Sequence, residues 1–361
     1  RLAHQLAGAG VGAGDHVALL LANGPEYLEA MLAAFKLRAV PINVNYRYVE
    51  RELAHLLTDS DSVAIITHGR FAPGVLDVRS QCPRLVHVLV VADETDLGEP
   101  ADVTDYETAL AASSPERPDG TDRSGDDLYI AYTGGTTGLP KGVMWRHEDI
   151  FFAALGGGDP STLEGPITRP DQLPSRIPEI GGVQLQCPPL MHVSAHWGAL
   201  QTLFGGGTAV LLSPGHFDAD EALDAVEAEG VMICVLVGDA MARPLADAIA
   251  ADGGRRELGS LFVIGSGGAM LTPSVKADLR RHLPDLVIVD GYGSSETGVA
   301  GSHTTMGDGT EHGTSFSTGF TMGPDTTVLD DDRRPVEPGS GIVGHLARRG
   351  HLPLGYYKDE E

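Results

Sequence analysis

Lysine is scarce in this sequence, and positive charge as a whole is in short supply. The chain has four lysines in 361 residues, and Lys+Arg number 25 against 50 Asp+Glu, which gives a formal net charge of −25. Such a protein would repel a nucleic-acid backbone or an anionic membrane surface over most of its area. We therefore exclude a nucleic-acid partner and expect any polyanionic ligand to be held by a local group of hydrogen-bond donors and positive charges.

Cysteine and long apolar runs are also rare. Cys82, Cys187 and Cys234 are odd in number and lack metal-ligand spacing, so we interpret them as buried free thiols in a reducing cytoplasm. No run approaches the ~18 apolar residues of a membrane span, and no charged-then-apolar signal segment is recognisable. The sequence therefore predicts a cytoplasmic protein without a transmembrane segment.

Short apolar runs alternate with helical patterns along the chain, which is typical of α/β proteins. The run "HVALLL" (16–21) predicts a strand, and residues 25–35 predict a helix. Most later strand candidates are near-continuous apolar runs, as expected when both faces of a sheet are covered. We interpret the acidic stretch 93–127, rich in Ser, Pro and Gly, as a solvated connection between two lobes.

The stretch "YTGGTTGLPKG" (132–142) combines glycines, threonines and one of the rare lysines. Glycines permit positive φ, so successive N–H groups can point into one concavity, while threonine hydroxyls and a lysine add donors and charge. A hairpin loop without any ligand is the alternative interpretation. The candidate phosphate-binding residues are Thr133, Gly134, Gly135, Thr136, Thr137, Gly138 and Lys141.

This stretch does not fit a P-loop. That motif needs a contiguous Gly-Lys-Ser/Thr and a helix directly after it. Here Leu139 and Pro140 separate Gly138 from Lys141, and "GVMW" (142–145) has the pattern of a strand.

Three motifs, in order along the chain, resemble those of the adenylate-forming superfamily, the AMP-binding enzymes. They are "YTGGTTGLPKG", "GSGGAML" (265–271) and "DGYGSSETG" (290–298). The resemblance covers nearly the whole chain. It implies the large N-terminal domain of such an enzyme, an α/β fold with two stacked sheet lobes and a smaller β-rich lobe. We expect these lobes at 1–125 (with the acidic connection), 126–300 and 301–361.

The resemblance also implies roles for single residues. Tyr292 would lie against the adenine, Glu296 would hold the Mg²⁺ that bridges the phosphates, and Thr297 would sit beside the α-phosphate. A loop at the carboxyl end of a strand is where open α/β sheets place ligands, although an acidic turn that merely ends a strand is the alternative. The implied catalytic residues are Thr133, Lys141 and Glu296, and the further ATP-binding residues are Gly267, Gly268, Ala269, Asp290, Gly291, Tyr292, Gly293, Ser294, Ser295 and Thr297.

Two segments resemble the acyl-binding parts of these ligases. "PPLMHVSAHWGAL" (188–200) implies that His192 lines or gates the acyl channel, unless it is a satisfied core histidine, and that Trp197 is pocket wall or core packing. "VLVGDAMARPL" (235–245) implies that Val237 and Gly238 touch the acyl group, as Gly268 would. Asp239 has two other interpretations, a cap of the following helix or a partner for an α-amino group.

The implied activity is an AMP-forming acyl-CoA ligase that uses ATP, Mg²⁺ and CoA on a carboxylic acid, either a long-chain fatty acid or a steroid side-chain acid. An adenylating enzyme that loads a carrier-protein thiol, and a non-catalytic nucleotide- or acyl-binding chain, remain as alternatives. Family members continue past "GYYKDEE" to a ribose-binding Thr-Gly-Asp segment and a small C-terminal domain. We therefore expect these 361 residues alone to bind nucleotide but to be catalytically incomplete. The sequence does not decide whether the protein forms a homodimer.

Overall fold

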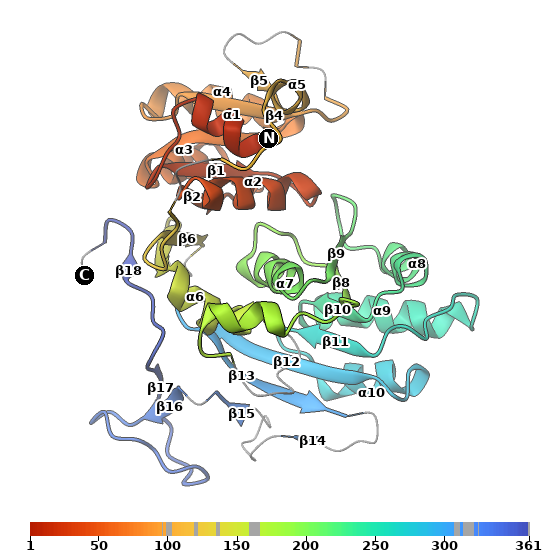
Figure 1. The fold of residues 1–361 in the computed structure, drawn as a ribbon. Coiled ribbons are helices and arrows are strands. Elements are labelled where there is room, and N and C mark those ends of the chain that lie inside the picture. The colour runs from red at the N-terminus through yellow and green to blue at the C-terminus, as the bar shows by residue number, and fades with distance from the viewer. Residues whose placement is uncertain are drawn as a thin grey trace. The chain divides into compact units, whose positions relative to one another are not determined.

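Within the described residues, the computed structural model of this protein contains two eight-stranded sheets, each with helices packed against it, and a small two-stranded sheet (Figure 1). This arrangement confirms the α/β fold predicted from the sequence. The structure describes residues 1–95, 97–98, 103–118, 122–134, 138–158, 167–306, 311–312, 321–323 and 325–359.

The chain divides into two units that are not contiguous in sequence. The first unit consists of Arg1–Ile150, Leu190–Val193 and Pro353–Glu361, and the second of Phe151–Pro189 and Ser194–Leu352. The short segment Leu190–Val193 lies in sequence between two parts of the second unit but belongs to the first. His192 is therefore a residue of the first unit.

The sheet of the first unit has the strand order β18-β7-β6-β2-β1-β3-β4-β5. The pairs β6–β7 and β7–β18 are antiparallel, and the other pairs are parallel. All residues of β1 are buried, which requires cover on both faces of the sheet. The strands are β1 His16–Leu20, β2 Val40–Asn43, β3 Ser62–His68, β4 His87–Val91, β5 Thr104–Asp105, β6 Leu128–Thr133, β7 Lys141–Arg146 and β18 Gly355–Tyr356.

Helices α3 and α4 share one buried cluster with the central strands, whereas α2 packs against β1 and β2, and α1 against α2 and α5. Helix α2 confirms the helix predicted at 25–35, with Pro25 in its first turn, where a missing N–H costs nothing. The helices are α1 Leu2–Gly8, α2 Pro25–Lys36, α3 Glu50–Asp59, α4 Ala72–Val78 and α5 Tyr106–Ala112, with 3₁₀-helices η1 Gly69–Phe71 and η2 Arg79–Gln81. Helix α6, His147–Ala153, begins in the first unit and ends in the second.

In the second unit, β14-β13-β12-β11-β10-β8-β9 form one sheet, β15 pairs with β13, and β16 and β17 form a separate two-stranded sheet. Helices α8, α9 and α10 share a buried cluster with β8, β10, β11 and β12. The strands are β8 Val183–Gln186, β9 Thr208–Leu211, β10 Ile233–Leu236, β11 Val263–Ser266, β12 Val287–Ser294, β13 Gly298–Thr305, β14 Glu311–His312, β15 Thr321–Met322, β16 Thr326–Leu329 and β17 His345–Arg348. The helices are η3 Gly156–Gly158, η4 Pro170–Ser175, α7 Val193–Phe204, α8 Ala219–Glu229, α9 Gly238–Asp252 and α10 Pro273–His282.

The structure divides the chain differently from the lobes expected at 1–125, 126–300 and 301–361. Strands β6 and β7 pair within the first sheet, because β6 lies beside β2, and β18 near the end of the chain pairs with β7. The acidic stretch 93–127 is more than a connection, since it contains α5, where Tyr106 is buried and donates a 2.6 Å hydrogen bond to Glu29. The three cysteines are free and buried, as predicted.

Candidate functional site

The candidate phosphate loop joins two antiparallel strands of the first unit, β6 and β7. Thr133, the last residue of β6, is opposite Lys141, the first residue of β7. Because a strand rather than a helix follows the lysine, the exclusion of a P-loop is confirmed. The predicted residues Gly135, Thr136 and Thr137 lie outside the described residues.

Side chains from other parts of the first unit fix both ends of this loop. The Tyr132 hydroxyl donates to Asp59 over 2.6 Å, and a ring nitrogen of His55 lies 3.2 Å from the carbonyl oxygen of Pro140. A Cβ at Gly142 would lie 2.7 Å from a ring carbon of Tyr132, so the close approach of the strands requires glycine there. Burial and the bond to Asp59 raise the pKa of Tyr132, which keeps it a neutral donor.

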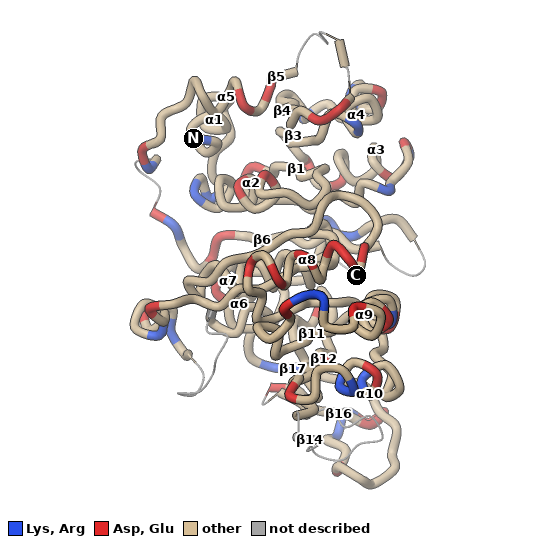
Figure 2. The backbone as a smooth tube through the Cα atoms, turned by 90° about the vertical axis from the view of Figure 1, so that its right-hand side faces the viewer, with Lys and Arg blue, Asp and Glu red and all other residues tan. Residues whose placement is uncertain are grey.

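Lys141 contacts a carboxylate from the far end of the chain. Its Nζ lies 2.5 Å from Asp359 and 5.5 Å from the centre of the Tyr356 ring. The lysine side chain is 60% exposed, and exposed ion pairs contribute at most about 1 kcal/mol. Figure 2 marks Asp and Glu positions along the backbone of both units, and the formal net charge is −25, so a phosphate at Lys141 would replace one anion in a strongly acidic protein.

One glycine of the loop does not use the positive φ that glycine permits. Gly134 does not occupy the left-handed region, and among the described residues no atom lies within 4 Å of a Cβ built there. Neither backbone geometry nor crowding in the described part of the chain therefore explains this glycine.

His192 lies in the segment 190–193 of the first unit, beside the carboxyl ends of β1 and β2. Leu190 donates its N–H to Asn23, and the carbonyl of Met191 accepts from Asn43, each over 2.8 Å. His192 is exposed, so the interpretation as a core histidine is wrong. Desolvation by neighbouring atoms and the positive charge of Arg47 lower the pKa of His192, which makes the ring neutral at pH 7.

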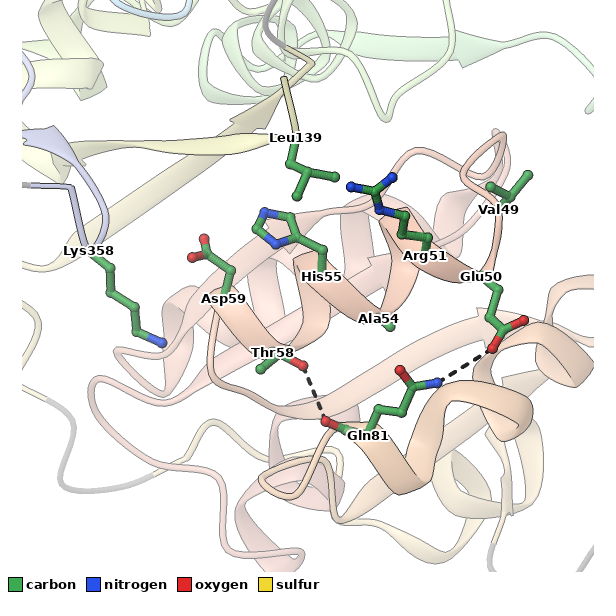
Figure 3. Close-up of a pocket in the computed structure, with 10 residues that line it drawn as sticks. All are labelled: Val49, Glu50, Arg51, Ala54, His55, Thr58, Asp59, Gln81, Leu139 and Lys358. Atoms are coloured by element: carbon green, nitrogen blue, oxygen red, sulfur yellow. Dashed lines mark hydrogen bonds between the residues drawn. The ribbon is translucent and has the colours of Figure 1, made fainter. Parts of the chain in front are cut away.

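A cavity of about 920 Å³ opens beside α3 in the first unit (Figure 3). Its wall joins α3 to Leu139 of the candidate phosphate loop and to Lys358, whose Nζ is 2.8 Å from Asp61. The lining carries carboxylates and basic groups side by side, so its charge indicates no single class of ligand. The lining residues are Val49, Glu50, Arg51, Ala54, His55, Thr58, Asp59, Gln81, Leu139 and Lys358.

In the second unit, the motif "DGYGSSETG" forms the end of strand β12 and the turn of a β-hairpin rather than a loop. Strand β12 extends to Ser294, and β13 starts at Gly298, so Asp290, Gly291, Tyr292, Gly293 and Ser294 are strand residues. The strand is prolonged because β13 pairs with it from Ile288 to Ser294. The close contact needs glycine, since a Cβ at Gly293 would lie 2.1 Å from the carbonyl oxygen of Gly298.

The turn of this hairpin is fixed by its own hydrogen bonds. The Thr297 hydroxyl accepts from the N–H of Ser294 at 3.0 Å, and the Ser294 hydroxyl accepts from the N–H of Glu296 at 3.2 Å. Ser295 is buried at the tip, and Glu296 is partly buried. Tyr292 on β12 is 53% exposed, so its ring is accessible to a planar ligand.

Asp290 differs from its neighbours, because its carboxylate is buried and lies 3.1 Å from Nζ of Lys276 on α10. Two of the chain's four lysines, Lys141 and Lys276, therefore accompany candidate ATP-binding segments. In the described part of the chain, no group of three or more His, Cys, Asp or Glu side chains is arranged to hold a metal ion. Glu296 thus offers a single carboxylate.

Of the other candidate residues of the second unit, Val237, Gly238 and Ala269 lie at the start of α9, whereas Trp197 lies on α7. Gly238 has a φ of 49°, and a Cβ there would lie 2.5 Å from the carbonyl oxygen of Met270, next to Ala269. Gly268 has a φ of 76°, and a Cβ at Gly267 would lie 3.6 Å from the carbonyl oxygen of Gly291, an ordinary contact. Val237 is the N-cap of α9, and Trp197 is buried on α7.

Asp239 does not cap α9, which corrects one interpretation. It lies inside the first turn, and its carboxylate accepts the N–H of Thr272 over 2.8 Å. The side chain therefore joins α9 to the start of α10, which reduces its availability to a ligand amino group.

Motif comparison missed Asn23, Asn43 and Arg348. Arg348 on β17 donates to the carbonyls of Thr297 and Val299, the latter over 2.8 Å, and so supports the turn that carries Glu296. Burial lowers the pKa of Arg348. A polar residue at the end of an apolar strand, as in "VPIN" (40–43), is a signal that could have identified Asn43.

The candidate residues thus form two groups. The first unit holds Thr133, Gly134, Gly138, Lys141 and His192, and the second holds Trp197, Val237, Gly238, Gly267 to Ala269 and Asp290 to Thr297. Within the described residues, no helix is both long and apolar enough to span a membrane.

Comparison with known proteins gives consistent matches. The sequence profile of the family described as "AMP-binding enzyme" matches residues 1–357. A 3-oxocholest-4-en-26-oate–CoA ligase of Rhodococcus rhodochrous is 45% identical over 100% of this chain and 65% of its own length. The medium-chain acyl-CoA ligase Mig of Mycobacterium avium is 43% identical over 98% of this chain and 63% of its own length. The chain therefore spans less than two thirds of these relatives.

Solved structures agree on the fold. The anthranilate CoA ligase AuaEII in complex with anthranoyl-AMP gives a TM-score of 0.79 at 20% identity, covering 99% of this chain and 64% of that one. A long-chain-fatty-acid CoA ligase, described as putative, from Rhodopseudomonas palustris gives 0.79 at 22% identity, covering 99% and 81%. At these identities the likeness shows a shared fold.

Proposed function

The chain belongs to the AMP-binding enzyme family, and on that premise we propose that it is the N-terminal domain of an AMP-forming acyl-CoA ligase. In this proposal a carboxylic acid is first activated with ATP to an acyl-adenylate. The acyl group then passes to the thiol of CoA. The acid would be a medium- to long-chain fatty acid or a steroid side-chain acid.

The observation that carries the proposal is the agreement among the relatives. Relatives between 40% and 45% identical, each aligned with 98% or more of this chain, are named CoA ligases of medium- or long-chain acyl groups or of a steroid acid. Their names support this substrate class for the present chain.

The first unit would supply the phosphate side of the reaction. Thr133 and the loop after it would donate hydrogen bonds to the triphosphate, and Lys141 would exchange its contact with Asp359 for the leaving phosphates. A protein with a net charge of −25 needs such a device to hold a tetra-anion. We propose the same triphosphate-binding role for residues 135–137 of the loop.

The second unit would supply the nucleoside and metal side. The exposed ring of Tyr292 suits stacking against adenine, and Thr297 would approach the α-phosphate. A single carboxylate, Glu296, fits Mg²⁺, since this ion binds through one or two carboxylates, substrate phosphates and water. Bound there, Mg²⁺ would neutralise charge on the phosphates.

The acyl side would consist of His192, Trp197, Val237, Gly238 and Gly268. His192, neutral at pH 7, can border an apolar chain without burying a charge. The bond between Asp239 and Thr272 favours an acyl tail over an amino acid, because an α-amino group would need that carboxylate as its partner.

The chemistry needs no protein nucleophile. A carboxylate oxygen of the acid attacks the α-phosphorus, the bond from that phosphorus to the bridging oxygen breaks, and pyrophosphate leaves. The CoA sulfur then attacks the acyl carbon, AMP leaves with the electron pair, and the thiol proton is released. The protein contributes positioning and charge neutralisation.

A panel of acids tests this proposal. The protein expressed from its complete reading frame is incubated with ATP, Mg²⁺, CoA and saturated, ω-oxidised or steroid acids, and acyl-CoA is measured by mass spectrometry. We expect acyl-CoA from at least one medium- to long-chain or steroid acid. Pyrophosphate release without acyl-CoA would favour a carrier-protein thiol as acceptor, and release of neither product would favour a non-catalytic binding chain.

A further inference from the structure

Two asparagines lie at the same edge of the first sheet. Asn43 is the last residue of β2, and Asn23 follows β1, its neighbour in the sheet. Strands β1, β2 and β6 are parallel, so their carboxyl ends meet at one edge. The segment 190–193 lies against this edge, where Leu190 and Met191 are buried.

The amide of Asn43 uses its donors and its acceptor on two separate segments. Its Nδ2 donates to the carbonyl of Tyr132 over 2.9 Å and to the carbonyl of Met191 over 2.8 Å, while its Oδ1 accepts the N–H of Tyr132 over 2.8 Å. The side chain thus pairs with both backbone groups of Tyr132, as a neighbouring strand would. Asn23 adds a bond of 2.8 Å from the N–H of Leu190.

Only a carboxamide of this length satisfies the pattern. A carboxylate would face two carbonyl oxygens that it cannot bond, and a leucine would leave three buried backbone groups without partners. With the amide turned over, its oxygen would point at those carbonyls, so the hydrogen bonds also fix its orientation.

We propose that Asn43, assisted by Asn23, is a positioning residue that fixes the acyl-side segment 190–193 against the phosphate-loop strand β6. Tyr132 precedes Thr133, and Met191 precedes His192, so one buried amide links the first residue of the phosphate loop to the histidine at the acyl side. The role in catalysis rests on the acyl-adenylation proposed above.

The expected consequence concerns rate more than affinity. Transfer of the adenylyl group to the acid requires the carboxylate oxygen to be aligned with the α-phosphorus, and a displacement of 1 Å can cost about 100-fold in rate. If Asn43 sets the relative placement of the two segments, its loss should lower kcat while ATP and the acid still bind.

The first test compares Asn43→Asp with Asn45→Asp in acid-dependent pyrophosphate release by the protein from its complete reading frame. Asn45 caps the N–H of Arg47 with its side-chain oxygen, which an aspartate can also do. We expect Asn43→Asp to lower kcat about 30- to 100-fold per folded molecule, with both KM values within about threefold, and Asn45→Asp to match the wild type. An Asn43→Asp enzyme with kcat within threefold of wild type would overturn the proposal.

The second test does not depend on activity. Hydrogen–deuterium exchange should rise in Asn43→Asp at both 129–133 and 189–193, while α9 and α10 stay unchanged. A rise in only one segment, or an equal rise everywhere, would contradict the link. If Asn43→Asp does not fold, Asn23→Ala serves instead, with faster exchange expected at 189–193 alone. If the wild type makes no acyl-adenylate, the proposed function fails. Hydrogen–deuterium exchange still decides whether Asn43 links segments 129–133 and 189–193.

Discussion

The two units hold their candidate residues in different ways. In the first unit, Lys141 and Asp359 are 218 residues apart, and Asn43 and Met191 are 148 apart. In the second, Ser294, Glu296 and Thr297 fix the hairpin turn through bonds that span two or three residues. The first group therefore depends on distant parts of the chain, whereas the second depends mainly on its own sequence. Mutations outside the motifs should act more strongly on the first group.

Loss of the loop lysine should have the largest effect. We expect Lys141→Ala to lower kcat/KM for ATP about 100-fold, or about 2.7 kcal/mol, because its proposed contacts are with the leaving pyrophosphate. AMP affinity should change less than about threefold, since AMP lacks these phosphates. Pyrophosphate release and equilibrium AMP binding measure the two, with Lys36→Ala at the end of α2 as control. Equal losses for ATP and AMP would remove this role.

Arg348 is the exception to the local character of the second group, and its loss should come next. We expect Arg348→Met to lower the free energy of unfolding of the second unit by about 2 kcal/mol, because the carbonyls of Thr297 and Val299 lose a charged donor. The adjacent Arg349 is exposed and pairs with Asp325 at 3.7 Å, so Arg349→Met should cost less than about 0.5 kcal/mol. Denaturant unfolding measures both variants. Equal stabilities would show that the turn needs no support from β17.

The carboxylate of the turn should have a smaller effect. Glu296→Gln should raise the Mg²⁺ concentration for half-maximal adenylation about tenfold, since an amide oxygen is a weaker ligand for a hard cation. The control is Glu229→Gln at the end of α8. A Mg²⁺ titration that does not move would exclude Glu296 as a metal ligand.

The same contrast explains what could be predicted from sequence. Apolar alternation and strand-like runs predicted the α/β class and the helix at 25–35, because these patterns depend on neighbouring residues. The strand extension over Asp290 to Ser294 and the return of 190–193 and β18 to the first sheet were missed. Both depend on pairing between segments far apart, for which one sequence carries no period or motif.

The candidate site shows this division residue by residue. Motifs located Lys141, Tyr292 and Glu296, whose roles in binding remain predictions. They did not locate Asn43, Arg348 or Asp359, which act on backbone or side chains of other elements and belong to none of the three motifs. The free, buried cysteines followed from their number and spacing alone.

The smallest expected effect concerns the ion pair of Lys141. Asp359→Asn should lower KM for ATP about two- to threefold, because the exposed pair is weak and the lysine would be released to the phosphates. Asp325→Asn, which removes the partner of Arg349 in the second unit, is the matched control. A higher KM in Asp359→Asn would mean instead that Asp359 holds the lysine in its working position.

Exchange of radiolabelled pyrophosphate into ATP tests the central claim most directly, because it reports acyl-adenylate formation without requiring CoA. With the protein from its complete reading frame, we predict exchange that requires both Mg²⁺ and a medium- to long-chain or steroid acid. The Lys141→Ala variant should lose this exchange activity. Exchange that proceeds without any acid, or cleavage of ATP to ADP and phosphate, would contradict the assignment of this chain to carboxylic acid activation.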